Sequence, residues 1–236
     1  MIAVAAFLAG AAGTALATGA VPGVSESERT KIEAIVRNYI LEHPEIIPEA
    51  MEKLESRQTA AAIDAIRPQI ETPFAGGWAG NEKGDATLVV FFDYACGYCR
   101  KSLPDIERLL AEDKGLKIVF RELPILSEDS EMAARVSLAA AKQGKFKAFH
   151  DALYETGRPT VANVEKVEAA IGMDEKKVAA EVGSAEYQKE IDANIAVARA
   201  LRFSGTPSWV IGDKVMNGAV GYDALKAAIA EARKKG

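Results

Sequence analysis

Residues 87–99, TLVVFFDYACGYC, decide the fold of this chain. The first eight are β-branched or aromatic with almost no polar interruption, which predicts a strand buried on both faces. A helical pattern follows from about 96 to 111, and the run KIVFR at 117–121 predicts a second strand. The order strand, helix, strand predicts a right-handed crossover and parallel pairing of the two strands.

The rest of the chain completes an α/β pattern. Helical periodicity occurs over residues 130–143, 146–156, 161–171 and 187–201, and strands are predicted at 208–211 and 215–217. Gly212-Asp213 between those strands is a two-residue hairpin signal, and a last helix is predicted over 222–234. We therefore expect one α/β domain over residues 72–236, with a helical insertion at about 127–190.

The N-terminal stretch has the character of a secretory signal over residues 1–20. It is mostly small and apolar, no charged side chain precedes Glu26, and Ala15-Leu16-Ala17 fits a cleavage site. The positively charged start is missing, and an uncleaved anchor is the alternative, for which the stretch is short. We expect export to an oxidising compartment, where disulfides persist.

Residues 25–67 form a separate helical segment. Ser25 and Glu28 fit a capping box, and Pro44 separates two helices. The second helix carries a heptad seam made of Ile47, Met51, Leu54, Gln58, Ala61 and Ala65. The seam either packs on its own domain or joins copies of the chain. Because its flanks are very polar and no strand lies nearby to cover, we expect self-association through residues 25–66, with Pro68 and Pro73 marking the boundary to the main domain.

The composition excludes several classes of protein. The chain has 236 residues, of which 49% are hydrophobic and 27% charged, as in soluble globular proteins. Its net charge of -5 disfavours binding to nucleic acid through bulk charge. Two cysteines exclude a four-cysteine zinc site, and a mixed site would need both histidines, His43 and His150, as well. We assign neither histidine a role.

Both cysteines lie in one Cys96-Gly97-Tyr98-Cys99 motif at the start of the predicted helix. Three interpretations compete: half of a metal site, a structural disulfide, and a redox-active dithiol. A metal site lacks a second ligand pair, and a bridge closing so small a loop constrains the unfolded chain little. The unpaired N–H groups of the first helical turn favour a Cys96 thiolate, which is the nucleophile of thiol–disulfide exchange. We therefore favour the redox pair.

Gly205-Thr206-Pro207-Ser208-Trp209 places a Thr-Pro step just before a predicted strand. A proline there suits a strand start or an edge. The bond can be cis, in which case its exposed backbone could face the dithiol and pair with a substrate strand, although a trans turn is the commoner alternative.

These motifs carry a family resemblance. FFDYACGYC (91–99), FRELPIL (120–126), the helical block and GTPSWVI (205–211) together resemble the thioredoxin-like disulfide oxidoreductases of the DsbA type, over roughly residues 72–236. The resemblance implies a thioredoxin-like fold with an inserted helical subdomain, an exposed nucleophile at Cys96, a resolving thiol at Cys99, a redox-active disulfide between them, and a cis-proline at Pro207. The N-terminal extension resembles the suppressor of copper sensitivity protein C (ScsC) group, periplasmic proteins that can trimerise through such a segment.

The chain departs from the DsbA pattern in two places. Gly97-Tyr98 stands where those oxidases carry Pro-His, and Val90 stands where they carry an acidic residue six positions before the first cysteine. Gly-Tyr and a threonine before the proline resemble the bacterial disulfide isomerase DsbC. Tyr98 brings no positive charge to the Cys96 thiolate, so we expect a less oxidising couple than that of a Pro-His enzyme, by on the order of 30 mV per pKa unit.

Other residues are candidates for supporting roles. Asp93 and Glu122 are possible proton acceptors for Cys99. Thr206, Pro207 and Tyr98 are candidates for substrate binding. Tyr98 and Trp209 either supply an apolar rim for unfolded substrates or pack locally.

The expected activity is that of an exported, periplasmic thiol–disulfide isomerase or reductase without a cofactor or metal. We expect disulfide-bonded or misfolded proteins as substrates, a membrane thiol reductant, and self-association, with a trimer favoured and no nucleic acid partner. The alternatives are a monomeric DsbA-like oxidase, a Cu(I)-binding copper-tolerance protein that uses the two thiolates, and a holdase.

Overall fold

The computed structural model describes residues 25–235. The expected signal, residues 1–20, lies outside them. The chain divides after Leu54 into two compact units. Between residues 25 and 235, the helices do not combine the length and the apolar character that crossing a bilayer requires.

The first unit contains helix α1, Glu26–Glu42, and the start of α2, Ile46–Glu71. The capping box at the start of α1 is confirmed, because Ser25 Oγ accepts from the Glu28 amide and the Glu28 carboxylate accepts from the Ser25 amide at 2.9 Å. The helix ends at His43, before Pro44. No residue of α1 is buried.

Helix α2 continues past Pro68 to Glu71, so Pro68 does not end it as expected. In its second part Ile63 and Ile70, one on each side of the proline, are buried. The stabilisation from these two apolar side chains outweighs the local cost of a proline within a helix. The second part of α2 is therefore an element of the larger unit.

The larger unit is built on a five-stranded sheet, within residues 25–235, of order β1-β3-β2-β4-β5. The strands are β1 (Trp78–Gly80), β2 (Ala86–Phe92), β3 (Leu116–Glu122), β4 (Ser208–Ile211) and β5 (Lys214–Asn217). The predicted parallel pairing of β2 with β3 is confirmed, and the other pairs are antiparallel. Strand β1 was not predicted from the sequence.

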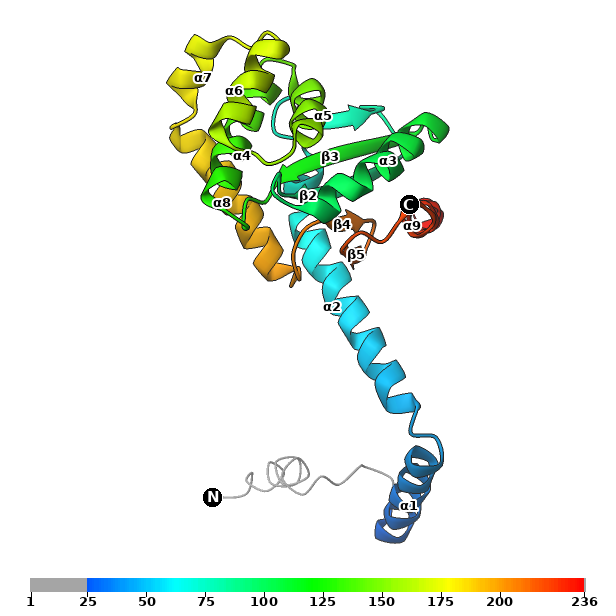
Figure 1. Cartoon of the computed structure of the whole chain (residues 1–236). Helices are drawn as coiled ribbons and strands as arrows, with labels where there is room; N and C mark the ends of the chain where they lie inside the picture. The colour runs from blue at the N-terminus through cyan, green and yellow to red at the C-terminus, as the bar shows by residue number, and fades with distance from the viewer. Residues whose placement is uncertain (1–24, 236) are drawn as a thin grey trace, which may run out of the picture. The chain divides into compact units, whose positions relative to one another are not determined.

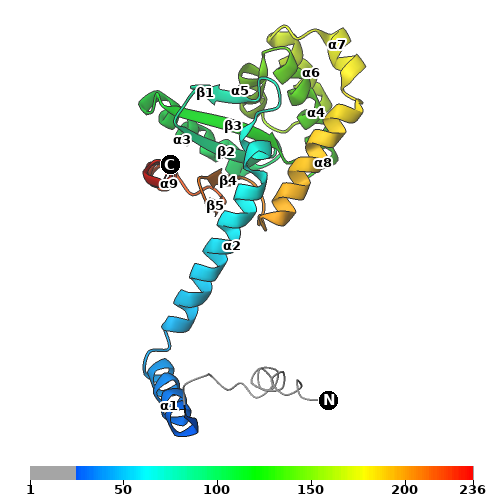
Figure 2. The same ribbon diagram turned by 180° about the vertical axis from the view of Figure 1, so that it is seen from behind.

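Helices cover both faces of the sheet, as Figures 1 and 2 show from opposite sides. One face packs against α3 (Gly97–Glu112), α5 (Phe146–Thr156) and α9 (Tyr222–Lys235), with Val90, Phe92 and Phe120 pointing into that core. The other face packs against the second part of α2 and α8 (Ala185–Ala200), with Val89 and Phe91 pointing that way. Strand β2 is thus buried on both faces, as its apolar sequence predicts.

The helical insertion follows β3 and lies beside the sheet (Figure 1). It contains α4 (Glu128–Lys142), α5, α6 (Val161–Ala170), α7 (Glu175–Glu181) and α8, which leads back to β4. Helix α7 was not predicted, and the helices extend beyond the expected end at residue 190, to Ala200. The α/β architecture with inserted helices agrees with the fold expected from the sequence.

Candidate functional site: a dithiol at the start of a helix

The two cysteines lie where β2 ends and α3 begins. Cys96 is the N-cap residue of α3, and its Sγ accepts a hydrogen bond from the backbone N–H of Cys99 at 3.4 Å. This is the unpaired donor of a first helical turn that the sequence predicts to face the sulfur. Both cysteines are free thiols. The motif therefore places the second thiol one turn behind the first.

Cys96 is less exposed than the family resemblance implies. Only 7% of its surface is accessible, and 4% of that of Cys99. The reason is that Cys96 Sγ lies against the backbone carbonyl of Thr206, to which it donates in the thiol form at 3.1 Å. Its neighbours Ala95, Gly97 and Tyr98 are exposed, so Cys96 lies just beneath the surface.

The surroundings of the two sulfurs separate their pKa values. The pKa of Cys96 falls from 9.0 to about 5, and the largest cause is the hydrogen bond with the Cys99 thiol. Thr206 and the backbone N–H groups of Cys99 and Tyr98 lower it further, and together these effects outweigh desolvation, which raises it. Desolvation, followed by the hydrogen bond with Cys96, raises the pKa of Cys99 far above its ordinary value. Cys96 is consequently the ready nucleophile, while Cys99 holds its proton.

The second motif lies directly beside the first. The Thr206–Pro207 peptide bond is cis, and its threonine carbonyl is the group that contacts Cys96. Tyr98 is 62% exposed and carries Lys101 Nζ 5.2 Å above its ring, so it remains a candidate for contact with substrate. Trp209, by contrast, is fully buried and donates to the Gly218 carbonyl at 2.9 Å, so its expected place in an apolar rim is wrong.

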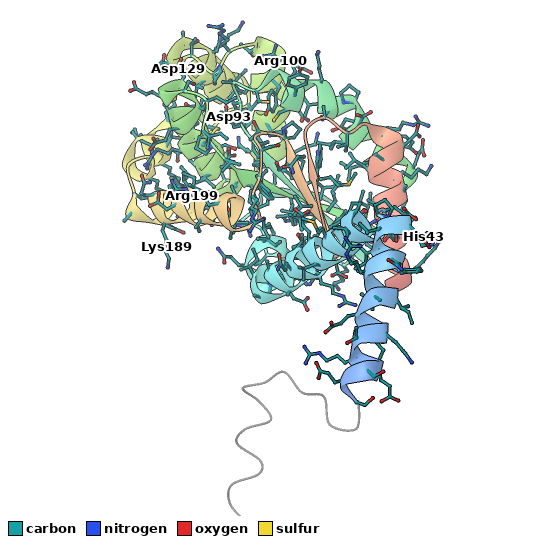
Figure 3. All side chains as sticks on the ribbon, turned by 90° about the horizontal axis from the view of Figure 1, so that it is seen from below. His43, Asp93, Arg100, Asp129, Lys189 and Arg199 are labelled. Carbon is teal, nitrogen blue, oxygen red and sulfur yellow. The ribbon has the colours of Figure 1, made fainter. Side chains whose placement is uncertain are left out.

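Asp93 has a structural role that the sequence did not reveal. Its buried carboxylate accepts four hydrogen bonds: from the amides of Ala95, Ile125 and Leu126, and from the hydroxyl of Ser130, at 2.7–3.0 Å. Figure 3 shows it in the interior of the domain. The bonds join the loop before the dithiol to the loop after β3, and they occupy the oxygens that a proton acceptor would need. These contacts favour a structural role for Asp93 over the expected role as a proton acceptor for Cys99.

Glu122, the other candidate acceptor, is buried at the end of β3 and pairs in register with Phe92. Among residues 25–235, its Oε1 is one of two buried side-chain oxygens without a hydrogen-bond partner, the other being Thr206 Oγ1. Desolvation raises the pKa of Glu122 well above its ordinary value, and the neighbouring carboxylates of Asp93 and Glu190 add to the rise. Such a carboxyl binds a proton more tightly than an exposed glutamate does.

His150 is a site residue that sequence reasoning missed. It is 2% exposed and lines, with Cys99, Tyr154 and Pro207, a cavity of about 10 Å³ whose other walls are apolar. Burial lowers the pKa of His150 to about 3, so the ring is neutral. The signal was the spacing Phe146, His150, Tyr154, which puts two polar groups on the apolar face of one helix.

Within residues 25–235 there is no group of three or more His, Cys, Asp or Glu side chains placed to hold a metal ion. His43 lies between α1 and α2, 3.3 Å from the carboxylate of Glu45.

Family models match two parts of the chain. Residues 87–230 match the DSBA-like thioredoxin domain, and residues 28–61 match the N-terminal domain of the copper resistance protein ScsC.

Solved structures agree with this division. A thioredoxin-like oxidoreductase from Silicibacter pomeroyi DSS-3 is 38% identical, with 70% of this chain and 95% of that chain covered and a TM-score of 0.67. The thiol-disulfide exchange protein alpha-DsbA2 from Wolbachia pipientis is 28% identical (75% and 96% covered, TM-score 0.69). Proteus mirabilis ScsC in a transitional conformation is 25% identical (91% and 99% covered, TM-score 0.68).

Curated relatives include the Na(+)/H(+) antiporter NhaA 3 of Salinispora tropica, 28% identical over 160 residues, 65% of this chain. The chain spans about a quarter of the length of the curated relatives it matches. Because the DSBA-like model covers more than half of the chain and the Silicibacter protein aligns over most of its own length, the chain belongs to the DsbA-like thioredoxin domain family, with a segment of the ScsC N-terminal type ahead of that domain.

Proposed function

We propose that this protein is a thiol–disulfide oxidoreductase that acts on the disulfides of other proteins. The observation that carries the proposal is the difference between the two thiols: Cys96, next to exposed residues, has a pKa of about 5, and Cys99 keeps its proton one turn behind. At neutral pH the first sulfur is therefore a thiolate ready to attack.

The chemistry uses both sulfurs in turn. The Cys96 thiolate attacks one sulfur of a substrate disulfide; the substrate S–S bond breaks, and the departing thiolate takes a proton from water. Cys99, once deprotonated, attacks Cys96 Sγ, which breaks the mixed disulfide and releases the second substrate thiol. The dithiol has then given two electrons to the substrate disulfide. In isomerisation, a thiol of the substrate resolves the mixed disulfide instead, and Cys96 is regenerated.

Isomerase or reductase activity fits the site better than oxidase activity. A pKa of about 5 for Cys96 lies between the values of roughly 3.5 and 7 that accompany the strongly oxidising DsbA and the reducing thioredoxin. Protein disulfide isomerase has an intermediate potential, about -180 mV. The structure also has no imidazole beside Cys96 within the CxxC motif, where Tyr98 is found. We infer a couple of intermediate potential, kept reduced in the periplasm by a membrane thiol reductant.

Self-association completes the proposal. Seven large apolar side chains of α1 and the first part of α2 are at least 50% exposed: Ile32, Ile35, Val36, Tyr39, Leu41, Met51 and Leu54. Burial of such side chains contributes about 1.5–3 kcal/mol each. The match of residues 28–61 to the ScsC N-terminal domain supports the same conclusion. We propose a homo-oligomer, with a trimer favoured, that presents several dithiols to one misfolded substrate.

The test is the redox equilibrium of the Cys96–Cys99 pair against glutathione, combined with reduction of insulin and refolding of a scrambled-disulfide protein. We expect an intermediate potential and rescue of the scrambled protein, both lost in Cys96→Ala. A wild type that oxidises reduced protein but cannot rescue scrambled protein would identify a monomer-type oxidase instead. A wild type without exchange activity that binds Cu(I) tightly in a parallel titration would overturn the enzyme proposal.

A further inference from the structure

The resolving step needs a proton acceptor that the dithiol itself does not supply. Cys99 must lose its proton before its sulfur can attack Cys96, yet desolvation raises the pKa of Cys99 far above neutrality. Val90 lines the cavity behind Cys99 and offers no acidic group. Asp93 is the nearest carboxylate in sequence, and its oxygens are occupied by four hydrogen bonds. We therefore looked beyond Val90 and Asp93 for the group that accepts the proton of Cys99.

The cavity behind Cys99 leads toward such a group. Its volume of about 10 Å³ is close to the space that one water molecule needs. Its walls carry three residues with polar side chains, Cys99, His150 and Tyr154. Because a buried water needs two or more polar partners, this cavity suits one water between the thiol and the imidazole.

From His150 a continuous series of buried groups continues to a carboxyl. His150 Nδ1 lies 3.3 Å from the Tyr94 hydroxyl, which lies 2.8 Å from Ser137 Oγ. The Ser137 side chain in turn acts on the Glu122 carboxyl, whose pKa it lowers against the larger effect of desolvation. All four residues are at most 4% exposed. They come from the loop after β2 and from α4, α5 and β3, so only the folded domain brings them together.

We propose that Glu122 is the proton acceptor for Cys99 and that the proton travels through the cavity, His150, Tyr94 and Ser137. The proposal rests on the thiol–disulfide activity proposed above and adds the path of its proton. As Cys99 Sγ attacks Cys96 Sγ, its proton enters this series, and Glu122 holds the equivalent proton until it exchanges with solvent. In the reverse reaction Glu122 returns a proton to Cys99 Sγ.

Each group along the route can either pass a proton on or hold it. A neutral imidazole accepts at one ring nitrogen and donates at the other, so His150 can pass a proton on, and its low pKa means that it does not keep it. Hydroxyl groups at Tyr94 and Ser137 likewise donate and accept. Glu122 retains the proton because burial raises its pKa. The unpartnered Oε1 leaves room on that carboxyl for a proton.

The charged and titratable neighbours of the route are few. Asp93 from the end of β2 and Glu190 from α8 face Glu122, and both favour its protonated form. Lys147 and Asp151 form an ion pair on the same helix as His150. Lys147 disfavours a charged imidazole, and Asp151 adds to the rise in the pKa of Tyr94, which desolvation dominates. Tyr154 donates to the Asp93 carbonyl at 2.8 Å and lies beside Cys99. These neighbours shift the pKa values of Glu122 and His150, and none of them lies between two members of the route.

The test mixes the reduced full-length protein with an aromatic disulfide, 5,5′-dithiobis(2-nitrobenzoate). The reactions of Cys96 and Cys99 can then be followed as two successive steps. Attack by Cys96 releases a first coloured thiolate, and attack by Cys99 on the mixed disulfide releases a second. Glu122→Gln and Tyr94→Phe should slow the second release at least about tenfold at neutral pH and displace its pH profile upward. The first release should change less than about twofold, which also reports an intact active-site helix.

Glu155→Gln is the matched control, because Glu155 is an exposed carboxylate on the same helix as His150, α5, and lies outside the proposed route. Both releases should be unchanged in this variant. A second release that is unchanged in Glu122→Gln and Tyr94→Phe would overturn the proton route while leaving the proposed activity intact. A wild type that releases neither thiolate would overturn the activity itself and the route with it.

Discussion

At the scale of the residue, the nucleophile is activated without a neighbouring imidazole. Hydrogen bonds from Cys99, Thr206 and the first helical turn lower the pKa of Cys96 to about 5, although desolvation opposes them. Tyr98, between the cysteines, is mostly exposed and contributes only its backbone N–H. The side chain at position 98 is therefore a place where the potential can be changed without disturbing the fold.

Tyr98→His should make the protein more oxidising. An imidazole beside the Cys96 thiolate stabilises the reduced form, and each pKa unit of added stabilisation raises the reduction potential by on the order of 30 mV. Tyr98→Phe is the control and should leave the potential unchanged. Equilibration with glutathione buffers measures both variants. Equal potentials for the histidine and phenylalanine variants would contradict the electrostatic explanation.

The same thiolate makes the stability of the reduced protein depend on pH. A folded pKa of about 5, below the ordinary 9.0, means that the stabilisation is fully present above pH 9 and is lost as the pH falls through 5. Relative to Cys96→Ser, the free energy of unfolding should rise by about 2–3 kcal/mol between these limits, less than the full difference in pKa would give, because solvent partly screens this thiolate. Urea unfolding under reducing conditions measures the difference, and a value that does not vary with pH would contradict the low pKa.

At the scale of the element, one buried arginine fastens the end of α2 to the sheet. Arg121, on β3, is 4% exposed and donates to the carbonyls of Gln69, Ile70 and Thr72 while pairing with Glu190 of α8 at 2.5 Å. The arginine thus satisfies the last carbonyls of α2, which have no partner within the helix. The next residue along β3 is Glu122, so the same strand end anchors α2 and presents the buried carboxyl.

Arg121→Met should destabilise the larger unit by about 3–5 kcal/mol, because it leaves Glu190 and the end of α2 without their partner in a buried place. Arg108→Met is the control. Arg108 is 59% exposed in its pair with Glu112, so its loss should cost much less than the loss of Arg121. Urea denaturation of both variants gives the two free energies, and equal losses would show that Arg121 is not a special anchor.

Elements were predictable from the sequence where the signal is local. Strand β2 carries a long apolar run, β3 carries a shorter one at Ile118–Phe120, and the β4–β5 hairpin carries Gly212-Asp213. Strand β1 was missed because its three residues, between glycines, have no pattern of their own and are ordered by pairing with β3. Helix α7 was missed because seven residues are too few for a clear helical period.

The candidate site shows the same division. Cys96, Cys99 and Pro207 lie in contiguous motifs, so the sequence could indicate them. The contacts of His150 with Tyr94, 56 positions away, and of Tyr94 with Ser137, 43 positions away, exist only once β2, α4 and α5 have packed. The burial of Trp209 likewise follows from its central strand, which pairs with β2 on one side and β5 on the other.

At the scale of the whole molecule, helix α2 belongs to both units, and its apolar side chains are exposed in the first part and buried in the second. In the larger unit, Ile63 and Ile70 belong to the core of the sheet. The expected heptad positions Ile47, Met51 and Leu54 remain 46–66% exposed in the first unit. A deletion through Ile66 would therefore remove Ile63 from the core, and a cut at the division after Leu54 is the better way to separate the proposed self-association from the proposed catalysis.

Leu54→Lys should convert the assembly into single subunits while the dithiol stays intact. A charge at a core position of the seam cannot be buried between helices without a large desolvation cost. Glu52→Lys, on the polar flank of the same helix, introduces the same charge and should leave the subunit number unchanged. Sedimentation equilibrium measures the mass of each variant. Rescue of a scrambled-disulfide protein should fall with the assembly, and oxidation of reduced protein should rise, because a lone dithiol can meet a single oxidising partner. If Leu54→Lys keeps the wild-type subunit number, the seam on α2 is not the contact between copies.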